Sequence, residues 1–286
     1  MFAASLKPVP APAAKGSAAA KARQASAPPT LDSSWVEHAG SPGLGVQAAS
    51  GLVVDLDRRS ILWQREPQAS RAPASLAKMV TAMVAADLAP LDRELTVPAE
   101  ATQVEPDSTV MGLAPGDRVT VRELMYGLFL ESGNDAAETL ARSLTDRRHF
   151  VELMNRKAAA LGMRSSRFTN PSGLDEPGMR TTAYDLALAA VAIAKRYPDL
   201  VAVAGTAHAV LPRTAGHRQF DLYTLNRLVS TYPGATGLKT GYTDEAGFCL
   251  AGTATRGGRQ LAVVVLGDGW SLTSDAAKLL DYGFSH

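Results

Sequence analysis

The chain has 286 residues, of which 46% are hydrophobic and 20% charged, a composition typical of a globular protein with one large domain or two small ones. Its 29 Lys and Arg residues nearly cancel its 28 Asp and Glu residues, so net charge gives no reason to expect a nucleic-acid partner. A single cysteine and five scattered histidines exclude an intramolecular disulfide framework and a cysteine zinc site, and we expect no metal. The longest all-apolar stretch, Leu186–Ala194, is too short to cross a bilayer.

The first part of the chain differs in composition from the rest. Residues 1–30 contain eleven Ala, five Pro and four basic residues but no acidic ones, which leaves 25 basic and 28 acidic residues downstream. Such a segment buries too little apolar surface to offset its ordering entropy. We therefore expect a disordered tail or linker over 1–40 and one folded domain over 41–286. Prolines and Lys15 interrupt the apolar run that a signal peptide would need.

Strands are expected first, followed by a helix. Val46–Asp55 and Ser60–Gln64 are predicted to form a hairpin around a polar turn at 57–59. From Ser75 to Leu88 the sequence is rich in Ala, Met and Leu and has no Gly or Pro, which predicts a helix.

Residues 91–200 are predicted to be mostly helical. Thr120 and Glu123 form a capping-box pattern that opens a helix over 121–130. Further helices are expected over 135–144, 147–161 and 182–195, with Gly162 just past the end of the second and a Gly/Pro-rich loop over 163–180.

Strands return after residue 206. They are expected at 208–211, 218–223, 248–255 and 259–266, with Gly257-Gly258 as a hairpin turn, before a final helix over 271–284. This order predicts an α+β fold in which an antiparallel β-sheet is flanked by helices and a mostly helical subdomain is inserted between its strands.

Ser75 and Lys78 are the first candidates for chemistry. Residues three apart on a helix are surface neighbours, so Lys78 can reach the Ser75 hydroxyl. A partly desolvated lysine loses proton affinity and can act as the base for a serine nucleophile. The plainer alternative is a helix-capping serine and a solvated lysine, but Lys78 is the one charged residue between Arg71 and Asp87.

Two further motifs follow in the chain. Ser132-Gly-Asn134 falls between two predicted helices, where it is either a simple connection or a turn that aims a hydroxyl and an amide into a cleft. Lys239-Thr240-Gly241 precedes a strand-rich region, where it is either an exposed loop or an edge strand to which a substrate peptide can add. The three motifs together, in this order, favour the catalytic interpretation.

The three motifs make the sequence resemble the serine D-alanyl-D-alanine carboxypeptidases, the low-molecular-mass penicillin-binding proteins. The resemblance covers roughly residues 45 to 286 and extends into the flanking phrases 74–82, 131–137, 168–175 and 237–247. It implies a β-lactamase/D,D-peptidase-like fold, an extracytoplasmic location in a bacterium, and peptidoglycan stem peptides and β-lactam antibiotics as partners. It implies no cofactor.

Carried over by position, the resemblance implies Ser75 as the acylated nucleophile, Lys78 as its base and Ser132 as a further catalytic residue. Substrate-binding residues would be Asn134, Lys239, Thr240, Gly241 and Tyr242, with the backbone N–H groups of Ser75 and Tyr242 as the oxyanion hole.

Two departures from the family pattern affect substrate preference and attachment to the membrane. Many members carry an arginine near the start of the last helix that binds the substrate carboxylate, and Trp270–Ser274 contains none. Carboxypeptidase action is therefore weighed against D,D-endopeptidase action. Many members also have a C-terminal β domain and a membrane anchor, and we expect that any membrane tether is not encoded in this chain.

Three alternative functions are compared with this one, and the first of them, a class A β-lactamase, shares the fold and the first motif. A class A β-lactamase needs a deacylating glutamate, where this chain has Ser166 in Ser166–Asn170. A non-catalytic wall-binding or β-lactam-sensing domain is disfavoured because all motif residues are intact. A glutaminase fits the surrounding phrases less well. Cys249 is expected to be a buried core residue.

Overall fold

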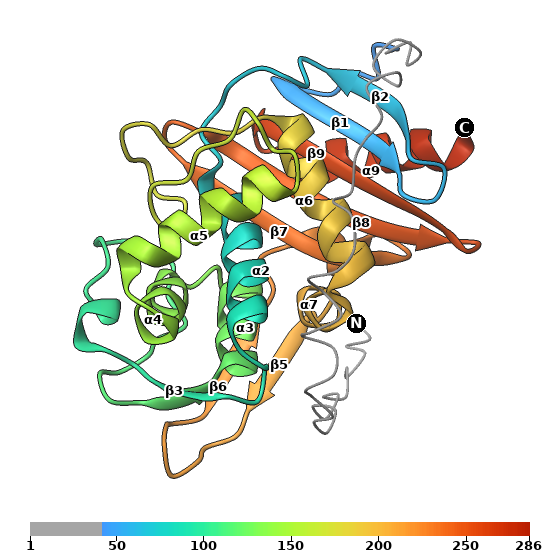
Figure 1. The fold of residues 1–286 in the computed structure, drawn as a ribbon. Helices are drawn as coiled ribbons and strands as arrows, with labels where there is room; N and C mark the ends of the chain where they lie inside the picture. The colour runs from blue at the N-terminus through green and yellow to red at the C-terminus, as the bar shows by residue number, and fades with distance from the viewer. Residues whose placement is uncertain (1–41) are drawn as a thin grey trace.

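The computed structural model describes residues 42–286, so the tail expected over 1–40 lies outside the described residues. A five-stranded antiparallel sheet with the order β2-β1-β9-β8-β7 forms the centre of the fold (Figure 1). Its strands are β1 (Ser50–Asp55), β2 (Ser60–Arg65), β7 (Ala235–Thr243), β8 (Gly247–Arg256) and β9 (Arg259–Asp268). The first and last parts of the chain therefore share one sheet, and β7 is an edge strand.

The strands β8 and β9 form the predicted hairpin around Gly257 and Gly258. Both glycines have positive φ (57° and 81°), which suits the tight turns that match strand twist. The register pairs Arg256 with Arg259 next to the turn and continues to Phe248 opposite Asp268.

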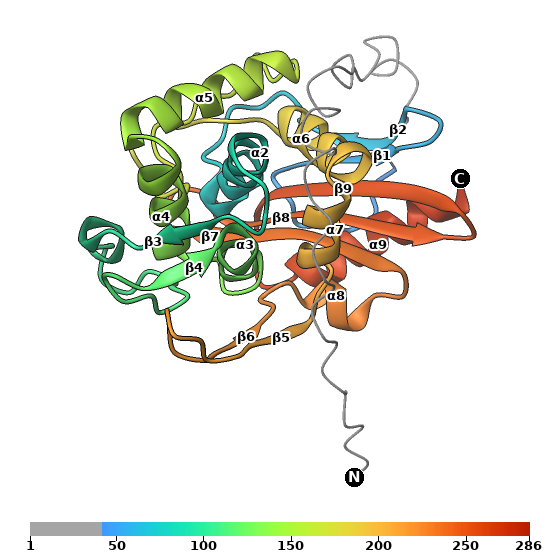
Figure 2. The ribbon, with the colours of Figure 1, turned by 60° about the horizontal axis from the view of Figure 1, so that its bottom comes forward.

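The sheet is covered on both faces, which explains its nearly continuous apolar strands. Alternate residues of β9 enter two different cores: Val263 and Val265 pack in one, and Val264 and Leu266 in the other. The C-terminal helix α9 (Leu272–Ser285) covers the first face, and α6 (Ala183–Arg196) lies on the second (Figures 1 and 2).

The middle of the chain forms the helical region between the first and later strands. Its longer helices are α2 (Lys78–Leu88), α3 (Val121–Phe129), α4 (Asn134–Leu144), α5 (Arg147–Ala160) and α6. The capping box is present: the Thr120 side chain accepts from Glu123 N, and the Glu123 carboxylate accepts from Thr120 N. Gly162 follows α5 with φ +81°. The predicted α+β architecture with a helical insertion is confirmed.

Several short elements were not predicted. Pro198 opens a short helix, because a proline at the first helical position loses no hydrogen bond. A second short helix begins after Asn226, whose side chain accepts from Leu228 N. The unpredicted elements are β3 (Glu94–Thr96), β4 (Arg118–Thr120), α7 (Pro198–Ala204), α8 (Arg227–Thr231) and a 3-10 turn at Ala99–Thr102.

The strand β5 (His208–Leu211) has the predicted bounds, and it pairs with β6 (Phe220–Tyr223) in a separate two-stranded sheet. β6 begins two residues later than expected and β1 four residues later. Cys249 is buried on β8, as predicted, and burial raises the pKa of its thiol to about 11.

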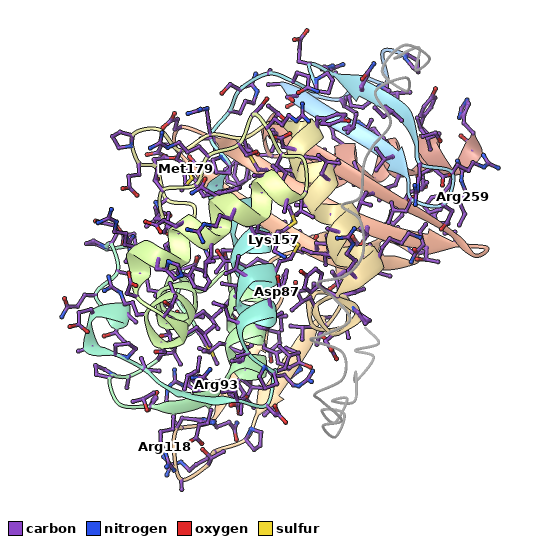
Figure 3. All side chains as sticks on the ribbon, in the orientation of Figure 1. Asp87, Arg93, Arg118, Lys157, Met179 and Arg259 are labelled. Atoms are coloured by element: carbon purple, nitrogen blue, oxygen red, sulfur yellow. The ribbon has the colours of Figure 1, made fainter. Side chains whose placement is uncertain are left out.

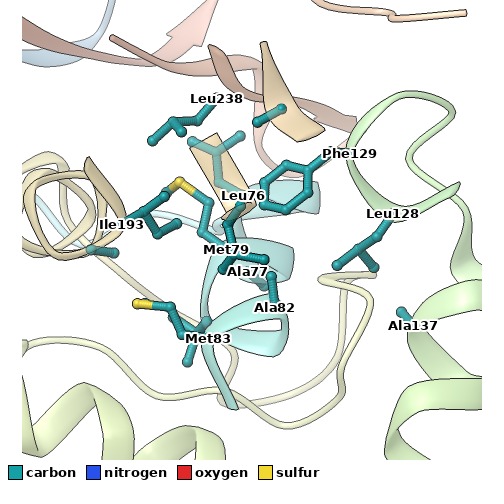
Figure 4. Packing of buried hydrophobic residues seen from close by; sticks show 14 of the residues in the cluster. Leu76, Ala77, Met79, Ala82, Met83, Leu128, Phe129, Ala137, Ile193 and Leu238 are labelled. Carbon is teal, nitrogen blue, oxygen red and sulfur yellow. The ribbon is translucent and has the colours of Figure 1, made fainter. Parts of the chain in front are cut away.

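The helix α2 is the centre of the larger core. Met79 and Met83 on this helix are fully buried, with Ile193 and Leu238 in the same cluster (Figure 4). At its C-terminal end, Asp87 forms an ion pair with Lys157 of α5 (Figure 3). Apolar packing and this ion pair therefore hold α2 on several sides.

Asp135 connects the start of α4 to the segment before β4. Its buried carboxylate accepts hydrogen bonds from the backbone N–H groups of Met111 (2.8 Å), Gly112 (2.8 Å) and Leu113 (3.0 Å). A charged acceptor that holds several buried N–H groups contributes more than an ordinary hydrogen bond. It fixes the turn that contains Ser132 and Asn134.

We expect Asp135→Ala to lower the free energy of unfolding by about 3 kcal/mol, because buried N–H groups then lose their acceptor. Urea denaturation followed by circular dichroism measures this. Asp117→Ala is the control, because the half-buried Asp117 carboxylate accepts a hydrogen bond from one backbone group, Ala114 N, instead of several, and its loss should cost about 0.5 kcal/mol. Equal stability losses in the two variants would contradict the anchoring role of Asp135.

Candidate active site

Ser75 lies in a tight turn before α2. The predicted helix over 75–88 is divided: Ala74–Ala77 is a 3-10 turn, and the α-helix begins at Lys78. Ala74 has φ +47°, a left-handed conformation that costs a non-glycine residue free energy. No side chain caps this turn, so the capping interpretation of Ser75 is wrong and its hydroxyl is free to face another group.

Lys78 is fully buried, so the interpretation as a solvated lysine is also wrong. Its Nζ lies 2.8 Å from Ser75 Oγ, 2.7 Å from Asn134 Oδ1 and 2.7 Å from the backbone oxygen of Ser172. Burial, and next the positive charge of Lys239, hold the pKa of the Lys78 amine well below its usual value.

These three contacts determine where a neutral Lys78 directs its lone pair. The Asn134 and Ser172 carbonyl oxygens can accept hydrogen bonds but cannot donate them. They therefore take the two N–H groups of the neutral amine, and the lone pair is left for Ser75 Oγ, which can donate. This arrangement suits removal of a proton from the serine hydroxyl.

The second motif forms a strained turn in front of α4. Ser132 is buried in a left-handed conformation with φ +60°, and its backbone oxygen accepts from Thr109 Oγ1 at 3.0 Å. Asn134 is the first residue of α4 and reaches Lys78 from the opposite side of the cleft. The alternative of a simple helix connection does not account for the buried Asn134–Lys78 contact.

The third motif lies on the edge strand β7, as predicted. Lys239 is fully buried, its Nζ donates to the Thr240 backbone oxygen at 2.7 Å, and burial lowers its pKa to about 7. Gly241 passes close to the nucleophile turn: a Cβ there would lie 2.7 Å from Ser75 N. Glycine is therefore required for β7 and the Ser75 backbone to approach each other.

The 163–180 loop supplies a part of the site that was not predicted. The Asn170 side chain accepts from Ser172 N and Gly173 N and so shapes the turn that aims the Ser172 backbone oxygen at Lys78. A Cβ on Gly173 would lie 1.9 Å from the Ala74 backbone oxygen. Residues 168–175 were part of the resemblance to the family. The contribution of the Ser172 backbone oxygen could not be predicted, however, because every residue type has this atom.

All eight predicted site residues belong to one region. A cleft of about 1060 Å³ is lined by Ser75, Ser132, Asn134, Thr240, Gly241 and Tyr242, while Lys78 and Lys239 are buried beneath it. The cleft lies between the free edge of the sheet and the helical region, so its β7 wall can accept an extended peptide.

A group of aromatic side chains borders the cleft just before α9. The family pattern has an arginine in this segment, and Trp270–Ser274 has none. The Phe248 ring lies between those of Tyr242 (centroids 4.7 Å apart) and Trp270 (5.0 Å apart). Trp270 is 94% exposed at the cleft mouth.

Residues 42–286 offer neither a cluster of metal ligands nor a membrane span. In this range the structure brings together no group of three or more metal-binding side chains. The same residues form no helix that is both long and apolar enough to span a bilayer.

The chain matches known sequences over most of its length. The family model for D-alanyl-D-alanine carboxypeptidases matches residues 36–269. D-alanyl-D-alanine carboxypeptidase DacB2 of Mycobacterium tuberculosis is 38% identical over 245 residues, covering 83% of this chain and 82% of the relative. DacF of Bacillus subtilis is 33% identical over 250 residues, covering 85% of this chain but 63% of the relative.

Solved structures agree with the sequence matches. A crystal structure of a D-alanyl-D-alanine carboxypeptidase from Mycobacterium tuberculosis has a TM-score of 0.79 at 36% identity, covering 87% of this chain and 95% of that one. A mutant of the Streptomyces K15 DD-transpeptidase has a TM-score of 0.78 at 30% identity, covering 84% and 99%. The chain belongs to the D-alanyl-D-alanine carboxypeptidase family, the peptidase S11 family of serine enzymes.

Proposed function

We propose that this chain is a serine D,D-carboxypeptidase that removes the terminal D-alanine from peptidoglycan stem peptides outside the cytoplasmic membrane. The observation that supports this most strongly is the buried Lys78 amine, held by two acceptor-only oxygens with its third contact on Ser75 Oγ. A lysine without a carboxylate partner in a dry site is suited to work as a base near neutral pH.

The proposed first step is acylation of Ser75. Lys78 takes the hydroxyl proton while Oγ attacks the carbonyl carbon of the D-Ala–D-Ala bond. The developing oxyanion is held by the backbone N–H groups of Ser75 and Tyr242, where β7 passes the nucleophile turn. The C–N bond then breaks, and the leaving nitrogen takes the proton that Ser132 passes on from Lys78. D-alanine therefore departs with a neutral amine, and Lys78 returns to its neutral form.

The second step is hydrolysis of the acyl-enzyme. Water, having lost a proton to Lys78, adds to the ester carbon, and Ser75 Oγ leaves with that proton.

Before either step, the intact substrate must bind. The buried charge of Lys239 and the Thr240 hydroxyl attract its terminal carboxylate, while Asn134 holds the stem amide.

β-Lactams are proposed as inhibitors because they carry a reactive amide followed by a carboxylate, as the D-Ala–D-Ala end of the substrate does. A fast β-lactamase is disfavoured by the position of Ser166. Its hydroxyl is engaged with the Asp185 carboxylate at 2.7 Å and with Thr181 Oγ1 at 2.8 Å, outside the cleft. No deacylating glutamate stands at this position, so the acyl-enzyme should persist.

Benzylpenicillin should add its own mass to the wild-type protein, and Ser75→Ala should abolish the adduct, because the attacking oxygen is lost. Intact-mass spectrometry over time measures this. Ser274→Ala is the matched control, since that hydroxyl is exposed on α9 and donates to Ser271 O. An adduct on the Ser75→Ala protein would refute the nucleophile assignment, and consumption of penicillin without an adduct would indicate a β-lactamase.

Lys78→Ala should slow acylation by about 10²- to 10⁴-fold, the range for loss of a positioned general base. Stopped-flow mixing with a fluorescent penicillin measures the rate constant. Lys157→Ala serves as the control for loss of a lysine, because its partner Asp87 lies at the far end of α2. An acylation rate within threefold of wild type in Lys78→Ala would remove Lys78 from the mechanism.

The second-order acylation rate should fall as pH rises through about 7, because the Lys239 ammonium that attracts the ligand carboxylate is then lost. The sign is opposite for Lys78, whose neutral form is required, so the full profile is bell-shaped. The measurement is the second-order acylation rate constant from pH 5 to 9. In Lys239→Arg its fall at high pH should be lost, because a guanidinium stays charged. A falling limb that persists unchanged in Lys239→Arg would assign it to another group.

A further inference from the structure

A groove rich in arginine lies next to the catalytic cleft, between α5 and the 163–180 loop. Its volume is about 1020 Å³. It is lined by six arginines and one acidic residue: Arg147, Arg148, Arg156, Arg164, Arg167, Arg180 and Glu152. In a chain with a net charge of +1, this is a strong local excess of positive charge.

Three of these six arginines form ion pairs within residues 42–286: Arg147 with Glu138, and Arg148 and Arg156 with Glu152. Glu152 is shared between Arg148 at 3.5 Å and Arg156 at 4.0 Å. The three arginines of the loop wall form no ion pair with any residue in the range 42–286; they are Arg164, Arg167 and Arg180. All three are exposed, so their guanidinium groups are available to a ligand.

The arginines also occupy positions that cost folding free energy. Arg167 and Arg180 are direct partners in an antiparallel bridge, with N···O distances of 2.8 and 3.0 Å, and like charges placed opposite each other are destabilising. Arg147 and Arg148 begin α5, where the helix dipole disfavours cations. An anion bound in the groove would relieve both costs.

We propose that this groove binds a linear polymer that carries repeating phosphate groups. Arginines stand on both walls, Arg148 and Arg156 on α5 and the other three on the loop, so an extended chain can be contacted from two sides. Arginine forms bidentate hydrogen bonds with phosphate oxygens, which makes it the preferred side chain for such a ligand.

A membrane surface fits this groove less well. The groove is concave, whereas a bilayer is flat, and none of the large exposed apolar side chains of residues 42–286 lies along it. Membrane-surface proteins combine positive charge with apolar side chains that enter the interface.

The groove lies directly beside the cleft, so a ligand bound in the groove is held close to the catalytic residues. Arg147 lines both of them, with its Nε on the Glu138 carboxylate at 3.0 Å. A polymer held in the groove would lie beside the cleft, so a substrate attached to that polymer would be at a raised local concentration. Binding in the groove does not depend on the proposed reaction.

The test compares two triple variants of equal charge change. Arg164→Gln, Arg167→Gln and Arg180→Gln remove the loop wall of the groove. Arg59→Gln, Arg93→Gln and Arg213→Gln are the control, since these exposed arginines lie outside the groove; Figure 3 labels Arg93 far from the 163–180 loop, where it labels Met179. Binding of fluorescent inorganic polyphosphate is measured by anisotropy at several salt concentrations, beside vesicles containing anionic phospholipid.

We expect the groove variant to lose at least tenfold in polyphosphate affinity, with less than twofold loss in the control variant. The slope of log Kd against log salt should fall by about 2 in the groove variant, because three contacts no longer release counterions. Acylation of both variants by penicillin should match wild type. Equal losses in both variants, absence of polyphosphate binding by wild type, or binding to vesicles alone would overturn the proposal.

Discussion

The buried amine of Lys78 is the constraint on which the rest of the site depends. An ammonium group is costly to desolvate, and here its neighbours are neutral oxygens and a second cation, Lys239, with no carboxylate in contact. The three oxygens come from three separate parts of the chain: the turn before α2, the start of α4 and the 163–180 loop. The fold must bring these segments together around one nitrogen, so stability and catalysis draw on the same contacts.

Close backbone approach is the second requirement, and it explains the strain around the site. Ala74 and Ser132 adopt left-handed conformations, while Gly173 and Gly241 leave room for the Ala74 and Ser75 backbones. The two left-handed residues depart from the backbone conformation that an isolated segment would prefer. Such strain persists only where surrounding structure holds it, here the large core around α2 and the Asp135 carboxylate. Ser75 therefore lies on a turn that the surrounding structure holds in place, with its hydroxyl 2.8 Å from Lys78 Nζ.

The sequence allowed prediction of the features that depend on local pattern. The capping box at Thr120 and the glycine turn at 257–258 follow from residue type and spacing, and both are present. The break between the 3-10 turn and α2 could not be predicted, because it results from tertiary contacts on an otherwise uniform helical sequence. The role of the Ser172 backbone oxygen was missed for a different reason: every residue has that atom, so only the three-dimensional arrangement singles it out.

The distribution of charge over the surface is another feature that the sequence alone does not reveal, because it depends on which segments the fold brings together. Near-neutral net charge correctly describes the whole chain, yet the fold gathers arginines from α5 and from the 163–180 loop along a single groove. The electrostatic potential that a ligand experiences decays within about 8 Å at physiological salt, so it is set by near neighbours and not by the total. Arg167 and Arg180 are thirteen positions apart in sequence but are paired across a bridge. A near-zero net charge therefore excludes a polyanionic partner only when the charges are evenly distributed over the surface. In this fold they are not, because the arginines gather along one groove.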